Sequence, residues 1–142
     1  MIVVDTNVVS ELMKPAPDAA VSRWVAGRPS SSLFTSTITQ AEILLGIELL
    51  PKGVRRSNLQ LAAETMFEWA FAGRILPFDE DAARALPRIA AHRRSLGRPI
   101  SQYDAQIAAI ALSRGAQIAT RDIADFAHCG ITVIDPWTNT AI

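Results

Sequence analysis

Short β-branched runs alternate along this sequence with longer segments of helical periodicity. The extended runs are Met1–Val4, Leu33–Ser36, Ile75–Phe78, Gln117–Thr120 and Ile131–Ile134. Strands that are separated by helices usually pair in parallel through right-handed crossovers. The sequence therefore predicts an α/β fold, with a small central parallel β-sheet of four to five strands flanked by helices.

Capping residues and helix breakers predict where the helices begin and end. Asp18, Thr39 and Ser101 each precede a segment of apolar periodicity, and each is expected to cap a helix. Pro87 lies inside a helical segment, so we expect a kink or a break there. The middle of the chain is nearly all helical, and residues 50–78 are predicted to form a helical arm that projects from the sheet.

Length and composition limit the class of protein. The 142 residues, of which 49% are hydrophobic, fit a single domain over residues 1–142. The 14 basic and 14 acidic residues cancel, so any nucleic-acid binding must depend on local charge. A single cysteine, Cys129, excludes an intrachain disulfide, and the chain shows neither a signal peptide nor a membrane-spanning run. We therefore expect a cytoplasmic protein.

Two acidic residues follow predicted strands. Asp5 comes directly after the first strand, and Asp122 comes shortly after the run that ends at Thr120. The carboxyl ends of parallel strands are where α/β proteins gather their functional groups. The alternatives are structural, because Asp5 can cap the following helix and Asp122 can be an ordinary loop acid.

Two further acidic residues lie on predicted helices. Glu42 shares a helix face with Ile38, Leu45 and Leu49, and a carboxylate on a core-facing apolar stripe must be paired, protonated or metal-bound. The alternative is a glutamate at the edge of that stripe that reaches water. Asp104 shares its face with Ile107, Ala108 and Ala111, although Ser101 to Asp104 also resembles a capping box.

A divalent cation explains four acids at one edge of a sheet. Carboxylates that cluster without a cation raise the pKa of one another by repulsion. Mg²⁺ and Mn²⁺ prefer oxygen ligands, activate water and neutralise charge on a phosphate. Asp5, Glu42, Asp104 and Asp122 are therefore predicted to be both the catalytic and the metal-binding residues.

Other phosphate chemistries fit the sequence less well. Phosphatases of the haloacid-dehalogenase type and receiver-type phosphoacceptor domains need a lysine near a late strand, whereas the lysines here are Lys14 and Lys52. The glycines form no phosphate-binding loop. His92 and His128 lack the spacing of a zinc site. A metal-dependent phosphatase or phosphoacceptor domain nevertheless stays as an alternative.

Four motifs in order resemble those of PIN-domain ribonucleases, and more narrowly the VapC-type toxins of type II toxin–antitoxin systems in their FitB-like branch. The resemblance extends to Ile134-Asp135-Pro136-Trp137. The motifs are Ile2-Val3-Val4-Asp5-Thr6-Asn7 with Ser10-Glu11, Thr39-Gln40-Ala41-Glu42 with Leu45-Gly46, Asp104-Ala105-Gln106-Ile107-Ala108-Ala109, and Ala119-Thr120-Arg121-Asp122 with Asp125-Phe126.

The resemblance implies a PIN-like fold and an endoribonuclease that depends on Mg²⁺ or Mn²⁺. The acidic quartet of the family falls on Asp5, Glu42, Asp104 and Asp122. Thr120, with Thr6 as a second partner, would brace the quartet from behind. The same resemblance implies a toxin of a toxin–antitoxin pair, and a non-cleaving nucleic-acid-binding module of the same fold is the alternative.

The expected partners are RNA, a VapB-like antitoxin and a second copy of the chain. The candidates for RNA contacts are Arg93, Arg94, Arg98 and Arg121. The segment from Leu61 to Phe71 is apolar on more than one helix face, which predicts a hydrophobic partner unless it packs on its own core. The family resemblance identifies that partner as the antitoxin and implies a homodimer or a toxin–antitoxin hetero-oligomer.

Overall fold

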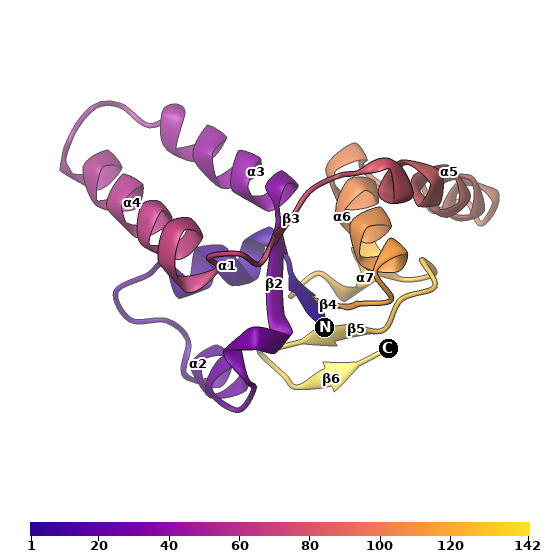
Figure 1. Ribbon diagram of the computed structural model, residues 1–142, viewed down its shortest axis with the longest axis horizontal. Coiled ribbons are helices and arrows are strands. Elements are labelled where there is room, and N and C mark those ends of the chain that lie inside the picture. Colours follow the sequence, from indigo (N-terminus) through magenta and orange to yellow (C-terminus); the bar gives the residue numbers. More distant parts are fainter.

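The computed structural model describes residues 1–142 and contains one six-stranded sheet (Figure 1). The spatial order of the strands is β3-β2-β1-β4-β5-β6; the first five pair in parallel, and β6 pairs antiparallel with β5. Their bounds are β1 Ile2–Val4, β2 Leu33–Ser36, β3 Ile75–Leu76, β4 Gln117–Ala119, β5 Val133–Asp135 and β6 Thr140–Ala141.

Each connection between parallel strands contains helices. The connections before β2, β3 and β4 each contain at least two, and the connection before β5 contains one short helix. A 3₁₀ turn precedes β2, and a π-helical segment, Thr65–Ala70, continues the fourth helix. The helices are α1 Thr6–Leu12, α2 Ala19–Ala26, α3 Thr37–Glu48, α4 Val54–Glu64, α5 Glu80–Ser95, α6 Gln102–Ser113 and α7 Ile123–Phe126.

Alternation along the central strands creates a core on each face of the sheet. Val3 and its neighbour Ile118 pack with α5, α6 and α7, whereas Val4 and Ala119 pack with α1 to α4. Figure 1 shows the two groups of helices on opposite sides of the strands. The predicted α/β architecture is therefore confirmed, with a sixth, antiparallel strand that the sequence pattern did not predict.

The strand order reverses direction between β1 and β4. The chain runs from β1 outward to β2 and β3, and it then returns to place β4 on the other side of β1. The crossovers on the two sides leave in opposite directions at this point, which opens a crevice at the carboxyl ends of β1 and β4. The pairing of Val4 with Ala119 brings Asp5 next to Thr120 there.

One predicted helix cap is wrong, and one predicted helix break does not occur. Thr39 does not cap α3, because the helix begins at Thr37 and the Ser36 hydroxyl accepts a hydrogen bond from the Thr39 amide at 3.1 Å. Pro87 does not break α5, which is continuous over 16 residues. Ala85 and Ile89 on either side of Pro87 are buried in the core, and this packing holds the helix together.

Within the predicted arm, residues 50–78, α4 extends beyond the sheet together with α3, which precedes the predicted bounds (Figure 1). Its far end returns to the core, where Phe67 and Phe71 are buried, while Trp69 is 77% exposed. The segment Leu61 to Phe71 therefore packs one face on the core of its own domain and leaves another face open to a partner. No helix in the structure combines the length and the apolar character that a membrane crossing requires.

Candidate active site

Asp5 is a buried carboxylate at the end of β1. Its side chain is in the N-terminal cap position of α1 but makes no capping hydrogen bond. Oδ2 instead accepts a hydrogen bond of 2.8 Å from the Thr120 hydroxyl at the end of β4. Only 6% of Asp5 is exposed. The capping role that was the structural alternative is therefore not the one its side chain performs.

Thr120 connects three groups of the site through a single hydroxyl. Its oxygen accepts hydrogen bonds from the Asn7 amide group at 3.2 Å and from the Asp122 backbone N–H at 3.1 Å. Both of these are donors, so the hydroxyl proton must be directed to Asp5. Asn7 also donates to Asp122 Oδ2 at 3.1 Å and accepts from the Arg121 backbone N–H at 3.2 Å. The loop after β4 is thereby fixed to α1.

Glu42 reaches the site from α3. Its Oε1 accepts a hydrogen bond of 2.9 Å from the Thr6 hydroxyl, and the Thr39 hydroxyl lies 3.1 Å from that of Thr6. Because Thr6 has one proton and gives it to the carboxylate, Thr39 must donate to Thr6. Thr6 and Thr120 thus each donate a hydroxyl hydrogen bond to one acid of the predicted quartet.

The sequence argument for Glu42 rested on an incorrect helix face. Leu45 and Leu49 of its supposed core-facing stripe are 49% and 76% exposed. The buried face of α3 instead carries Thr39, Ile43 and Ile47. Glu42 is half-buried at the boundary between these faces. Its place in the site depends on the contact of α3 with α1 rather than on burial among leucines.

Asp104 reaches the site from the first turn of α6. The Ser101 hydroxyl caps this helix by accepting a hydrogen bond of 3.2 Å from the Asp104 backbone N–H. Ile107, Ala108 and Ala111, on the same face, are fully buried as the sequence pattern predicted. The capping function belongs to the serine, and the half-buried carboxylate of Asp104 stays free to act in the site.

Burial and mutual repulsion raise the pKa values of three of these acids. Loss of solvation is the main cause at Asp5, whose pKa rises from 3.8 to about 6, and the Thr120 hydrogen bond partly offsets it. The charges of Asp104 and Glu42 raise the pKa of Asp5 further. Desolvation also raises the pKa values of Glu42 and Asp104, to which Asp122 and Asp125 add repulsion at Asp104. The carboxylates thus lie close enough to oppose one another's ionisation.

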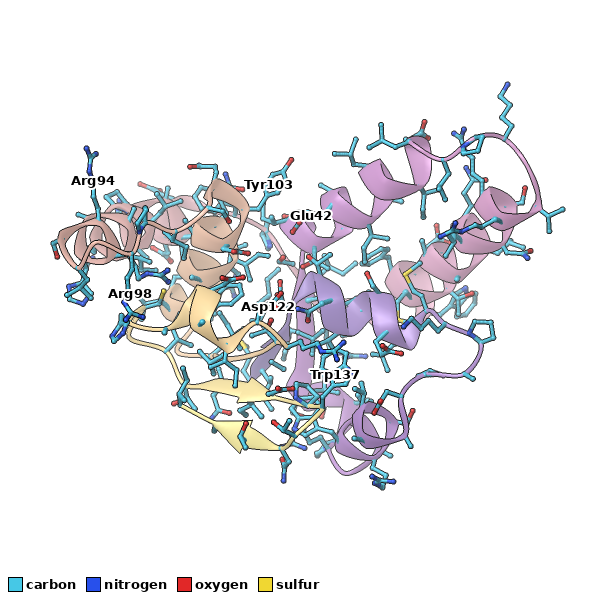
Figure 2. All side chains as sticks on the ribbon, turned by 180° about the vertical axis from the view of Figure 1, so that it is seen from behind. Glu42, Arg94, Arg98, Tyr103, Asp122 and Trp137 are labelled. Carbon is cyan, nitrogen blue, oxygen red and sulfur yellow. The ribbon has the colours of Figure 1, made fainter.

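These acids line one open cavity of about 630 Å³. Figure 2 shows Glu42 and Tyr103 at one rim of this region and Asp122 and Trp137 further along it. No three His, Cys, Asp or Glu side chains come close enough to hold a metal ion by themselves. The donors are hard carboxylate oxygens, which suits Mg²⁺ or Mn²⁺, and Mg²⁺ commonly binds through one or two carboxylates and keeps several waters.

The arginines proposed for RNA contact have different positions. Arg93 is only 5% exposed and donates to the carbonyl oxygens of Asp125 and Ala127, so its prediction as an RNA contact is wrong. Arg94, in the last turn of α5, and Arg98, shortly after that helix ends, lie away from Glu42 and Asp122 (Figure 2) and do not line the acidic cavity. Arg121 does line the cavity, and its guanidinium stacks on the Trp137 ring at 5.0 Å.

Eight residues of the cavity were not among the predicted site residues: Asn7, Ser10, Glu11, Lys14, Ser101, Tyr103, Asp125 and Trp137. Asn7 was within reach of the sequence argument, because it lies two residues after Asp5 and α1 starts at Thr6. Trp137 had no local signal. It lies in the turn between β5 and the unpredicted strand β6, and its backbone N–H donates to Asp135 Oδ1 at 2.8 Å.

Comparison with known proteins matches this chain to the same family that its sequence motifs resemble. Residues 2–130 match the PIN domain family. The chain is 42% identical to the VapC ribonuclease Y4jK of Sinorhizobium fredii, over 96% of this chain and 98% of that protein. It is 37% identical to Toxin FitB of Neisseria gonorrhoeae, over 96% and 99% of the two chains.

The fold agrees with these sequence matches. The structure superposes on a chain of FitAB bound to an IR36 DNA fragment with a TM-score of 0.88, at 37% identity and 96% coverage of both chains. The carboxylates from β1, α3, α6 and the loop after β4 all fall within the matched residues 2–130. This chain therefore belongs to the PIN domain family.

Proposed function

We propose that this protein is a Mg²⁺- or Mn²⁺-dependent endoribonuclease and the toxin of a toxin–antitoxin pair. The observation that carries the proposal is that Asp5, Glu42 and Asp104, which come from three different elements, line one cavity. Burial raises the pKa values of all three, and the charge of Asp104 raises those of Asp5 and Glu42 further. An acidic cavity of this kind repels a phosphate backbone until a cation enters it. The relatives named a VapC ribonuclease and Toxin FitB support the same function.

The carboxylates are assigned roles according to their surroundings. The buried Asp5 and the half-buried Asp104 would hold the cation directly. Glu42 and Asp122 would orient the attacking water or hold a second cation. A bound cation supplies an activated water and neutralises charge on the phosphate. The Thr120 hydroxyl holds the Asp5 carboxylate in place, which would keep it oriented to bind the ion.

Glu42 is suited to act as a general base. The Thr6 hydroxyl occupies its Oε1, and no protein donor contacts its Oε2. Its pKa is raised by desolvation, which brings the carboxylate closer to the range of a useful general base. Oε2 would therefore accept a hydrogen bond from the water that attacks phosphorus.

The direct test is cleavage of RNA by the purified protein, free of antitoxin. We expect cleavage with Mg²⁺ or Mn²⁺, complete loss in EDTA, and recovery when the cation is returned. Asp104→Asn should lower the rate by at least about 100-fold, since it removes an oxygen ligand and a charge together. Asp81→Asn changes an exposed acid of α5 in the same way and should leave the rate unchanged.

The competing functions predict different results in this assay. A non-cleaving module would bind RNA in a manner that survives Asp104→Asn and would release no products. A metal-dependent phosphatase would turn over a small phosphomonoester and leave RNA intact. Full cleavage in EDTA, or full activity of Asp104→Asn, would refute the proposal.

Thr120→Val tests the support of Asp5 separately from its charge. Valine keeps the shape but removes the donor to Asp5 and the acceptor for Asn7 and the Asp122 amide. We expect about a 10- to 100-fold loss of cleavage rate. The pH profile should shift to higher pH, because the hydrogen bond that lowers the pKa of Asp5 is lost. Thr120→Ser keeps the hydroxyl and should stay near the wild-type profile.

An apolar cavity is the proposed contact for the antitoxin. This cavity of about 370 Å³ is lined by Leu12, Val25, Leu33, Met66 and Phe71 among others. It joins α1, α2 and the segment around the exposed Trp69, so an apolar segment from a partner can bury its side chains there. The exposed Leu45 and Leu49 of α3 are the corresponding surface for a second copy of the chain.

A further inference from the structure

Trp137 lines two separate cavities. One is the acidic cavity, and the other, of about 370 Å³, lies between α2 and the turn that joins β5 to β6. Its lining includes Arg23, Trp24 and Arg28 on one side and Thr138 and Asn139 on the other. Figure 2 shows Trp137 on the side of Asp122 toward α2. The two cavities therefore meet at this one aromatic side chain.

The second cavity has the opposite charge to the first. Its lining contains two arginines and no acidic residue. Neither Arg23 nor Arg28 has a carboxylate within the 4.0 Å of a salt bridge, in contrast to Arg56, Arg84 and Arg114. The chain as a whole is neutral. This cavity thus offers unpaired positive charge immediately beside the acidic site, where a polyanion needs it.

Aromatic rings accompany the arginines in both cavities. The Arg28 guanidinium lies 3.9 Å from the Trp24 ring centre, and the Arg121 guanidinium lies 5.0 Å from that of Trp137. Trp24 is 5% exposed, and its indole N–H is buried without an acceptor. Trp137, unlike Trp24, is partly exposed. Arginine combined with a partly exposed aromatic ring is how proteins hold single-stranded nucleic acid without reading its sequence.

The turn that carries Trp137 is rigidly built. Asp135 is buried, and its carboxylate and carbonyl accept hydrogen bonds from the backbone N–H groups of Trp137 at 2.8 Å and Asn139 at 2.7 Å. Asn139 adopts the left-handed conformation with φ 56°, which asparagine tolerates better than most residues. A ring held in this way loses little freedom when a base stacks on it.

We propose that the cavity between α2 and the β5–β6 turn is a subsite for single-stranded RNA, adjacent to the cleaved phosphodiester. A base stacks on Trp137 at the boundary, and the neighbouring phosphate is held by Arg23 and Arg28. The proposal rests on the ribonuclease function proposed above and adds the direction in which the substrate strand leaves the acidic cavity.

RNA binding and RNA cleavage test the subsite independently. In a non-cleaving Asp5→Asn background, the dissociation constant of a fluorescent single-stranded RNA of about ten nucleotides is measured over a range of salt concentrations. Arg23→Gln with Arg28→Gln should raise this constant about tenfold and reduce the salt slope by about 1.4, as expected for two lost phosphate contacts. Trp137→Ala should raise the dissociation constant about tenfold, while Trp137→Phe should retain most of the RNA affinity.

Arg94→Gln with Arg98→Gln is the matched control, because it removes the same charge from exposed arginines that also lack a carboxylate partner. It should change RNA affinity less than about twofold. In the otherwise wild-type enzyme, the Arg23 and Arg28 changes should raise KM and leave kcat nearly constant, as for lost uniform binding. Thermal unfolding of each variant verifies that it is folded.

The possible outcomes separate the two proposals. If the wild-type protein does not cleave RNA, the ribonuclease proposal fails, while the binding experiment still tests the subsite. Equal RNA affinities of the two double variants, at equal salt slopes, would overturn the subsite. Loss of antitoxin binding with unchanged RNA affinity would also overturn it, because the cavity would then belong to a protein partner.

Discussion

Replacement of Asp5 by Asn is expected to abolish RNA cleavage and, at neutral pH, to stabilise the fold. The activity should fall by at least about 1000-fold, as for removal of one member of a catalytic unit. Asparagine keeps the size of the side chain and still accepts the Thr120 hydrogen bond. It removes only the negative charge that the buried site disfavours.

The stability gain follows from the pKa of Asp5, which rises from 3.8 to about 6 in the folded protein. Between these pH values the folded state binds more protons than the unfolded state, so stability falls as the pH rises through this window. Above pH 6 the carboxylate is ionised, and its burial lowers the free energy of unfolding by at most about 3 kcal/mol. Asp5→Asn removes this penalty at pH 7, and its advantage should disappear below about pH 4.

Urea unfolding at pH 7 and at pH 4 measures this effect. We expect Asp5→Asn to raise the free energy of unfolding by about 1 to 3 kcal/mol at pH 7 only. Asp81→Asn, in an exposed ion pair of α5, should stay within about 0.5 kcal/mol of wild type. Added Mg²⁺ should stabilise the wild-type protein more than Asp5→Asn. A variant that is less stable at pH 7, or that keeps full activity, would contradict the account of Asp5.

Arg93→Met is expected to destabilise the protein more than any change at the cavity surface. The buried guanidinium donates to the carbonyl oxygens of Arg98 at 2.7 Å, Asp125 at 2.7 Å and Ala127 at 3.0 Å. Methionine fills part of the space and leaves these oxygens without a partner. The expected loss is about 3 to 5 kcal/mol, a large part of the total stability of a typical domain.

Replacement of Arg93 should also disturb the acidic cavity. It anchors α7 through the Asp125 carbonyl, and its charge lowers the pKa of Asp104. Urea unfolding of Arg93→Met should show a much lower midpoint than that of Arg94→Met, which changes the exposed neighbour on the same helix. Arg93→Lys keeps the charge without the planar set of donors and should fall between the two. Equal midpoints for Arg93→Met and Arg94→Met would show that these hydrogen bonds contribute little.

Local patterns were sufficient for the five parallel strands and for the edge of the sheet at which Asp5 and Asp122 lie. The apolar runs at Ile2–Val4 and Gln117–Ala119 are read correctly because a buried parallel strand needs a continuous apolar stretch. The acids that follow such strands must then gather at one edge. The buried face of α6 beside Asp104 was also predicted correctly, because its residues Ile107, Ala108 and Ala111 are all apolar.

The same reasoning was less reliable where burial depends on which element packs against another. The helix face of Glu42 was predicted to be buried, yet Leu45 and Leu49 are exposed because α3 packs on α1 through Ile43 and Ile47. Arg93 was predicted to lie on the surface, yet the loop after α7 covers it and supplies its acceptors. A helical pattern shows which residues share a face, but it does not show what covers that face.

The sequence by itself determined the parallel strands of the α/β fold and the two acids that follow them, Asp5 and Asp122, because strand periodicity and strand-end acids are local features. Only the tertiary structure decided what surrounds those carboxylates. Thr120 and Asn7 lie 113 residues apart in the chain and meet at 3.2 Å because β1 and β4 are neighbours. Trp137 reaches the acidic cavity because a two-residue strand, β6, closes the final turn. Contacts between distant segments form only when the whole sheet assembles, and a short strand is stable only within it.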